Sequence, residues 1–521
     1  MADQGAAAEI AAGYATEAGA LELGTVVIDG AVDPTARVRI PFATLNRHGL
    51  VAGATGTGKT KTLQNLAEQC SAHGVPVLLA DIKGDLSGLA REGEKNDRVT
   101  QRATDTGDDW APTAYPVQFL SLGAGIGIPV RATITGFGPI LLSKVLGLNE
   151  TQESTLGLIF HWADQQGLAL LDTKDLRSVI QHLLSDEGKE ALKGIGGVST
   201  STAGVILRAL VNLEARGGDE FFGEPEFDPA DLLTVEPDGK GRVTLLELAD
   251  QQADPMLYST FLMWLLAELF EDLPEAGDIE KPKLVFFFDE AHLLFSDASK
   301  AFLDRIEQTV KLIRSKGVGV FFCTQQPTDV PNDVLSQLGA RVQHALRAFT
   351  PDDQKALTRT ARTYPKSAVY DIETSLTSLG TGEAIVTVLS ERGAPTPVAW
   401  TRVRAPRSLM AAIGEPAVTD AAKASPLWPK YGEAVDRESA YEKLSASTGA
   451  SSAPAPAEPL PPGQPPQEAP PQAPPPAQDE EPGFIEKTMK SSWFQSVVRT
   501  VAREATQEIT RGMFGTARRR R

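Results

Sequence analysis

Short apolar runs alternate with longer stretches of helical periodicity from Leu21 to about Arg404. Most of these runs are continuous in Val, Leu and Phe instead of alternating with polar residues. Strands of this kind are typically buried on both faces of a parallel sheet that helices cover. We therefore predict an α/β fold with a mostly parallel sheet. The predicted strands are Gly49–Ala52, Val75–Ala80, Pro116–Leu120, Val243–Leu248, Leu284–Phe288, Val318–Cys323, Arg341–Leu346 and Ala384–Leu389, preceded by two short ones at Thr25–Ile28 and Val38–Ile40.

Helical patterns replace the strands between residues 129 and 216. Asn149 followed by Gln152 has the spacing of a capping box. Asp172 is placed to cap a helix whose apolar face runs from Leu176 to Leu184. We expect an all-helical insertion within the α/β domain.

Composition changes at both ends of the chain. Residues 1–20 are rich in Ala and Gly, which predicts a disordered N-terminus. Residues 451–483 hold 13 of the 36 prolines, so they form an extended linker. The predicted division is a disordered segment at 1–20, a first core part at 21–128, the helical insertion at 129–216, a second core part at 217–410, a connecting segment at 411–450, the linker at 451–483 and a basic amphipathic tail helix at 484–521.

The formal charge of −18 is unevenly distributed. The tail from Phe484 to Arg521 carries nine Lys and Arg against three Glu, which is +6, so residues 1–483 sum to −24. An acidic body disfavours nucleic-acid binding over its outer surface. The tail has the composition to contact anionic lipid, an acidic protein surface or nucleic acid.

The cysteine content fits a reducing compartment. Cys70 and Cys323 are the two cysteines, and neither has a CxxC partner. The first twenty residues carry no Lys or Arg, so they lack a secretory n-region. No apolar run approaches the roughly 20 residues that span a bilayer. We expect a cytoplasmic protein.

The segment Gly53–Thr60 reads GATGTGKT and satisfies the phosphate-loop pattern G-x-x-x-x-G-K-S/T. A predicted strand enters it and a helical pattern leaves it, which is the context that a phosphate loop requires. Its glycines let backbone N–H groups point at phosphate oxygens. Lys59 would reach the β- and γ-phosphates of ATP, and Thr60 would bind Mg²⁺. The expected nucleotide-binding residues are Gly53, Ala54, Thr55, Gly56, Thr57, Gly58, Lys59, Thr60 and Lys61.

Two carboxylates follow the apolar strand Leu284–Phe288. Parallel α/β sheets bind ligands at the carboxyl ends of their strands, so Asp289 and Glu290 are expected beside the phosphate loop. Asp289 would bind Mg²⁺, and Glu290 would act on the attacking water. The adjacent His292 is interpreted as a packing residue.

Further segments match one group of proteins. They are DIKGD at 81–85, LVFFFDEAHLL at 284–294, RSKGV at 314–318, VFFCTQQP at 320–327, DVLSQ at 333–337 and RAFTPDDQ at 347–354. Together they resemble the HerA/FtsK class of P-loop ATPases, and most closely the bacterial HerA-like family. The resemblance covers residues 21–405 and the tail from Trp493. It departs from HerA helicases in the short segment before the phosphate loop, which is too short for their β-barrel.

The resemblance implies a RecA-like core, ATP hydrolysis and a hexamer that acts on duplex DNA. By motif position, Gln325 would sense the γ-phosphate, and Arg314 or Arg347 would compensate transition-state charge in a neighbouring site. Asp81 and Asp85 would lie near the γ-phosphate or orient Lys83, or they would cap the helix that follows, and the sequence leaves these interpretations open. The alternative function is a nucleotide-dependent switch or assembly ATPase that acts on protein or membrane partners.

Overall fold

The computed structural model describes residues 2–123, 125–192, 196–248, 255–277, 279–295 and 300–447. The predicted linker and the predicted amphipathic tail therefore lie outside the described residues. No helix among the described residues combines the length and the apolar character needed to cross a bilayer.

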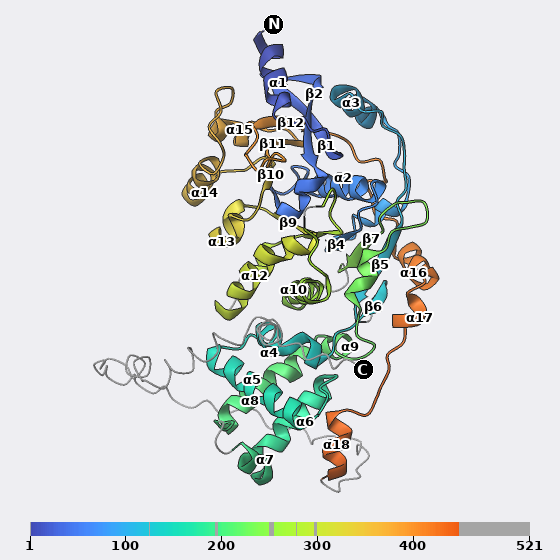
Figure 1. Ribbon diagram of the computed structural model, residues 1–521, viewed down its shortest axis with the longest axis vertical. Helices are drawn as coiled ribbons and strands as arrows, with labels where there is room; N and C mark the ends of the chain where they lie inside the picture. Colours follow the sequence, from blue (N-terminus) through green and yellow to red (C-terminus); the bar gives the residue numbers. More distant parts are fainter. Residues whose placement is uncertain are drawn as a thin grey trace, which may run out of the picture.

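A 12-stranded sheet runs through the molecule in the order β2-β1-β12-β11-β10-β3-β9-β8-β4-β7-β5-β6 (Figure 1). All neighbours from β10 to β6 are parallel, whereas β2, β1, β12 and β11 extend the sheet in antiparallel fashion. This confirms the mostly parallel α/β sheet. The strands are β1 (Ala20–Ile28), β2 (Ala31–Pro41), β3 (Gly49–Ala52), β4 (Val77–Asp81), β5 (Val117–Leu122), β6 (Ile128–Val130), β7 (Val243–Glu247), β8 (Leu284–Phe288), β9 (Val318–Thr324), β10 (Ala340–Gln343), β11 (Glu383–Thr387) and β12 (Ala399–Val403).

Helices cover both faces of the sheet and build a separate layer at one end of it. The α-helices are α1 (Ala2–Ala12), α2 (Lys59–Ala72), α3 (Asp97–Thr106), α4 (Ile134–Val145), α5 (Glu150–Gln165), α6 (Thr173–Leu184), α7 (Asp186–Ala191), α8 (Thr200–Glu214), α9 (Gly218–Phe221), α10 (Pro255–Asp272), α11 (His292–Phe295), α12 (Lys300–Ile313), α13 (Asn332–Leu335), α14 (Pro351–Ala361), α15 (Ile372–Ser378), α16 (Glu415–Ala424), α17 (Trp428–Tyr431) and α18 (Ala440–Ser447).

Alternate residues of the central strands belong to different cores. In β8, Phe286 and Phe288 pack in the cluster that contains the apolar faces of α10 and α12. Val285 and Phe287 pack in the cluster that contains the face of α2. Since side chains alternate along a strand, a strand buried on both faces needs an uninterrupted apolar run. The continuous run that predicted β8 has this origin.

Two strands were not predicted, and the two N-terminal strands are longer than predicted. β6 has only three residues, and β12 alternates between buried and partly exposed positions because it lies in the antiparallel part of the sheet. β1 and β2 form a hairpin that pairs with β12, so the segment before the phosphate loop extends the main sheet.

The prediction of a disordered N-terminus is wrong. Residues 2–12 form α1, and Ala7, Ile10 and Tyr14 are buried in the core that α2 shares. The Tyr14 hydroxyl lies 2.9 Å from the carbonyl of Val386 and 2.6 Å from that of Pro397. Small residues allow α1 to lie close to β1 and β2, which composition alone did not reveal.

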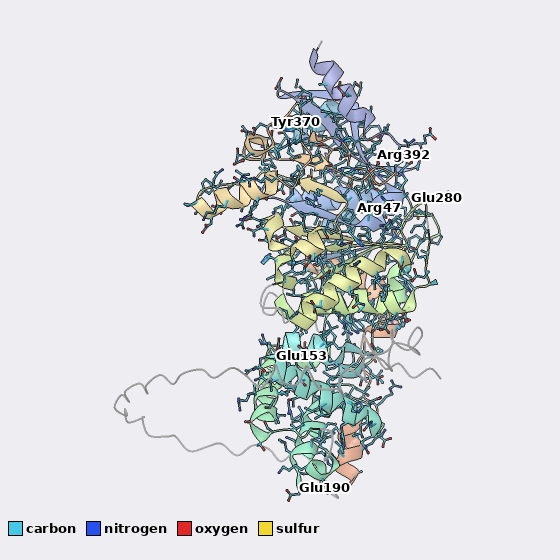
Figure 2. All side chains as sticks on the ribbon, turned by 60° about the vertical axis from the view of Figure 1, so that its left-hand side comes forward. Arg47, Glu153, Glu190, Glu280, Tyr370 and Arg392 are labelled. Carbon is cyan, nitrogen blue, oxygen red and sulfur yellow. The ribbon has the colours of Figure 1, made fainter. Side chains whose placement is uncertain are left out.

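The stretch from Ile134 to Phe221 holds α4 to α9, which form a helical layer at the end of the molecule opposite α1. Glu153 and Glu190 mark this layer in Figure 2, and Tyr370 marks the sheet region. The capping box at Asn149 and the N-cap at Asp172 are present as predicted, and Asp172 also forms a capping box with Asp175. The C-terminal segment returns to this layer, where the Tyr441 backbone N–H donates to Asp175 at 2.8 Å.

Candidate nucleotide site

The loop Gly53–Thr60 lies between the end of β3 and the start of α2. Gly53, Gly56 and Gly58 have φ values of 151°, 79° and 117°. L-residues with a side chain rarely adopt such angles, so these glycines permit the tight path of the loop. Gly58 precedes α2 and offers no side-chain cap to its first turn. The N-terminus of α2 therefore suits an anion as its cap.

Lys59 is folded back on the loop. Its Nζ donates to the carbonyl of Gly53 at 2.7 Å and lies 3.3 Å from that of Ala54. The hydroxyl of Thr57 also donates to Ala54, at 2.7 Å. An ammonium group has three donors, so Lys59 can hold the loop and still reach a phosphate.

The two predicted motifs meet at one edge of the sheet. β9 pairs in parallel with β3 on one side and with β8 on the other. The carboxyl ends of all three strands consequently lie together. This register places the phosphate loop after β3, Gln325 after β9, and Asp289 and Glu290 after β8.

Glu290 has a strained backbone and an unsatisfied side chain. Its φ is 46°, in the left-handed region that residues other than Gly, Asn and Asp seldom adopt. Its Oε2 is buried without a hydrogen-bond partner, and the Nδ1 of His292 lies 3.4 Å away outside hydrogen-bond geometry. Strain and an unpaired polar atom at the same residue are typical of a functional position.

Asp289 shares its environment with Cys323. Desolvation, and then the neighbouring Glu290 carboxylate, raise the pKa of Asp289. The Cys323 thiol donates a hydrogen bond to it, and the charges of Lys59 and Glu290 also act on Cys323. Cys323 thus contacts the acidic pair from β9, a role that its apolar neighbours in the sequence did not indicate.

The remaining predicted site residues lie at opposite ends of the strands. Gln325 is exposed directly beyond β9. Arg347 is also exposed at this edge, two residues after Ala345, whose carbonyl accepts from Ala54 N at 2.8 Å. Arg314 is exposed before β9 begins, at the opposite edge from the phosphate loop of its own chain.

Asp81 caps a turn beside the site. Its carboxylate accepts from the backbone N–H groups of Leu86 at 2.7 Å and Lys83 at 3.3 Å. Burial raises its pKa to about 6. The Lys61 ammonium, whose pKa burial lowers, donates to Gln64 at 3.0 Å within α2. The contacts of Asp81 are thus those of a capping residue, with backbone N–H groups as its hydrogen-bond donors.

These residues fit Mg²⁺ and a phosphate chain. Thr60 lies in the first turn of α2, and Asp289 lies across β9 from it. A hydroxyl and a carboxylate are the oxygen ligands that Mg²⁺ uses beside substrate phosphates. The start of α2 has no side-chain cap, which suits an anion. The Oε2 of Glu290 has no hydrogen-bond partner, so it can accept a hydrogen bond from a water molecule.

Comparisons with known proteins agree on one group. The family model described as "Helicase HerA-like C-terminal" matches residues 28–521. The chain is 23% identical over 369 residues to the DNA double-strand break repair helicase HerA of Sulfurisphaera tokodaii, over 70% of this chain and 66% of that protein. It is 30% identical over 163 residues to the probable helicase MJECL08 of Methanocaldococcus jannaschii, over 30% of this chain and 29% of that protein. The matches thus span less than two thirds of these relatives' own lengths.

A solved structure shares the fold. It is the bacterial conjugative coupling protein TrwBdeltaN70 in its unbound monoclinic form, with a TM-score of 0.50 and 17% identity. The alignment covers 78% of this chain and 93% of that chain.

Proposed function

The chain belongs to the HerA-like helicase C-terminal family, and from this membership and the site geometry we propose that it hydrolyses ATP to drive an oligomeric motor on duplex DNA. One observation carries the proposal. The register of β3, β9 and β8 brings the phosphate loop, Asp289 and the strained Glu290 to one edge of the sheet. The name of the Sulfurisphaera tokodaii relative, a DNA double-strand break repair helicase, supports DNA as the substrate.

The residues divide the reaction among them. Lys59 and the backbone N–H groups of the loop would hold the β- and γ-phosphates. Thr60 and Asp289 would hold Mg²⁺, which when bound neutralises charge on the phosphate oxygens. Glu290 would accept the proton of the attacking water through Oε2, which has no hydrogen-bond partner and lies 3.4 Å from the Nδ1 of His292. Gln325, between the two motifs, would orient that water.

The placement of Arg314 supports assembly. It lies before β9, at the end of the sheet away from the phosphate loop of its own chain, and in a ring it would serve the site of a neighbouring copy. An arginine supplied in this way stabilises charge that develops in the transition state. We propose a homo-oligomer, a hexamer by family resemblance, in which Arg314 or Arg347 completes the adjacent site.

The test is ATPase activity with and without duplex DNA over a series of salt concentrations. The motor predicts stimulation that weakens as salt rises, because phosphate contacts release counterions. Lack of stimulation at low salt would leave the ATPase assignment intact and remove the DNA-directed motor.

The acidic body favours a second candidate. Residues 1–483 carry −24, which disfavours DNA binding outside a pore. The alternative is a nucleotide-dependent switch that binds protein or membrane partners through the basic tail. Deleting residues 484–521 and measuring DNA, liposome and self-association separately distinguishes these partners, and the tail has no such role if all three are unchanged.

A further inference from the structure

His344 lies behind the phosphate loop and takes no part in the proposed reaction. It follows β10, which is the neighbour of β3 on the side away from Asp289. The residue is fully buried. Buried polar side chains are normally hydrogen-bonded, so the partners of its two ring nitrogens are informative.

The backbone at His344 forms the floor of the loop. His344 N donates to the carbonyl of Ala52 at 2.7 Å, and the next carbonyl, that of Ala345, accepts from Ala54 N at 2.8 Å. A Cβ on Gly53 would lie 2.5 Å from the Cβ of His344. The first residue of the loop therefore rests directly on His344.

The imidazole connects two elements that flank the loop. Its Nδ1 lies 2.8 Å from the carbonyl oxygen of Glu383, which can only accept, so Nδ1 carries the proton. Its Nε2 lies 2.9 Å from the hydroxyl of Thr62 in the first turn of α2. Burial lowers the pKa of His344 to about 4, so the ring is neutral and Nε2 accepts from Thr62.

The residue before Glu383 also holds the loop. Gly382 N donates to the carbonyl of Thr57 at 2.9 Å, and Arg102 in α3 donates to the Gly382 carbonyl at 2.9 Å. A Cβ on Gly58 would lie 3.2 Å from Gly382. The start of β11 is thus a fixed support for the end of the loop, and the imidazole ties the first turn of α2 to it.

We propose that His344 is a positioning residue for nucleotide binding, which sets the first turn of α2 through its hydrogen bond with Thr62. The proposal rests on the proposed function only in that the loop Gly53–Thr60 binds the phosphates of ATP. The backbone N–H groups of that turn must face the phosphates, so a shift of the turn weakens every one of these contacts together.

Two substitutions remove the bond from opposite sides. His344→Asn keeps a donor for the Glu383 carbonyl and withdraws the acceptor from Thr62. Thr62→Val removes the hydroxyl and keeps the shape of the side chain. Loss of one hydrogen bond predicts affinity for ATP that is about fivefold to tenfold weaker in each variant. The double variant should be no weaker than either single one, because both remove the same interaction.

His48 provides a matched control. It is the other buried histidine, directly before β3, the strand that pairs with β10, and its Nδ1 accepts from Val320 N at 3.1 Å. Burial also lowers its pKa to about 4. His48→Asn removes an equally buried imidazole far from the loop, and Asn tolerates the φ of 60° found there.

The experiment measures equilibrium binding of ATP with Mg²⁺ by titration calorimetry, and the melting temperature of each variant without nucleotide. We expect weaker binding in His344→Asn and Thr62→Val, recovery in Thr62→Ser, and wild-type affinity in His48→Asn despite a lower melting temperature. Wild-type affinity in Thr62→Val, or equal losses in His48→Asn and His344→Asn, would overturn the proposal. Absence of ATP binding by the wild-type chain would instead overturn the proposed function.

Discussion

The Nζ of Lys59 donates to the carbonyl of Gly53 at 2.7 Å, so the lysine closes the phosphate loop on its own first residue. The loop is therefore formed by contacts within the protein. The backbone angles of its glycines and its contacts with His344 and Gly382 also hold the loop in this conformation. A binding site that exists before the ligand arrives loses less entropy on binding.

Lys59→Ala should lower ATP turnover by about 100-fold or more, since it removes the charge that faces the phosphates during cleavage. Steady-state phosphate release measures this. Lys355→Ala is the control, because Lys355 is an exposed residue of α14 that pairs with Asp352. Equal turnover in the two variants would refute the assignment of the loop.

Glu290→Gly should stabilise the chain while it abolishes hydrolysis. The left-handed φ of 46° costs a residue with a side chain about 1 kcal/mol, and glycine avoids this cost. Urea unfolding measures the free energy of unfolding. Glu290→Ala also lacks the carboxylate but keeps the Cβ, so the Gly variant should be the more stable of the two. Equal stability would mean that the backbone at this position is unstrained.

Asp81→Asn should change how stability depends on pH. Burial raises the pKa of Asp81 to about 6, above the ordinary value of 3.8, so the folded state prefers the neutral carboxyl. The resulting stabilisation of the wild type is complete below pH 4 and is lost as the pH rises through about 6. Asparagine does not titrate, so the wild type should gain about 2.4 kcal/mol relative to the variant between pH 7 and pH 4. Urea unfolding across this range would show parallel curves if Asp81 titrated normally.

Tyr14→Phe should lower the free energy of unfolding by about 1 kcal/mol, because its buried hydroxyl bonds the carbonyls of Val386 and Pro397. Tyr441, which is 45% exposed, provides the control substitution Tyr441→Phe. A Tyr14 variant as stable as that control would indicate that the two hydrogen bonds of its hydroxyl contribute nothing to stability.

The parallel core was predictable because burial of a strand on both faces requires consecutive apolar residues, which the sequence shows directly. Continuous apolar runs such as Leu284–Phe288 are required for burial on both faces, and the loop pattern at Gly53–Thr60 fixes the strand–helix junction. The order in which strands pair in the sheet depends on contacts between segments far apart in the chain. The sequence therefore did not reveal that β9 separates β3 from β8, or that β1, β2 and β12 extend the same sheet.

The residues that support the site were missed for a related reason. Cys323 ends the apolar run 318–323 and His344 follows Gln343 in a mixed segment, so neither residue carries a spacing signal. Their roles depend on partners far along the chain, such as Thr62 for His344. The left-handed backbone of Glu290 is equally invisible in the sequence, because glutamate is not a residue that favours it.

The most direct measurement for the DNA motor is electron microscopy of Glu290→Gln with ATP and Mg²⁺, with and without duplex DNA. This variant should bind ATP and hydrolyse it slowly, since the amide cannot accept the proton of the attacking water. The proposed function predicts six-fold rings with duplex DNA through the centre. A monomer or dimer that is unchanged by DNA would contradict it.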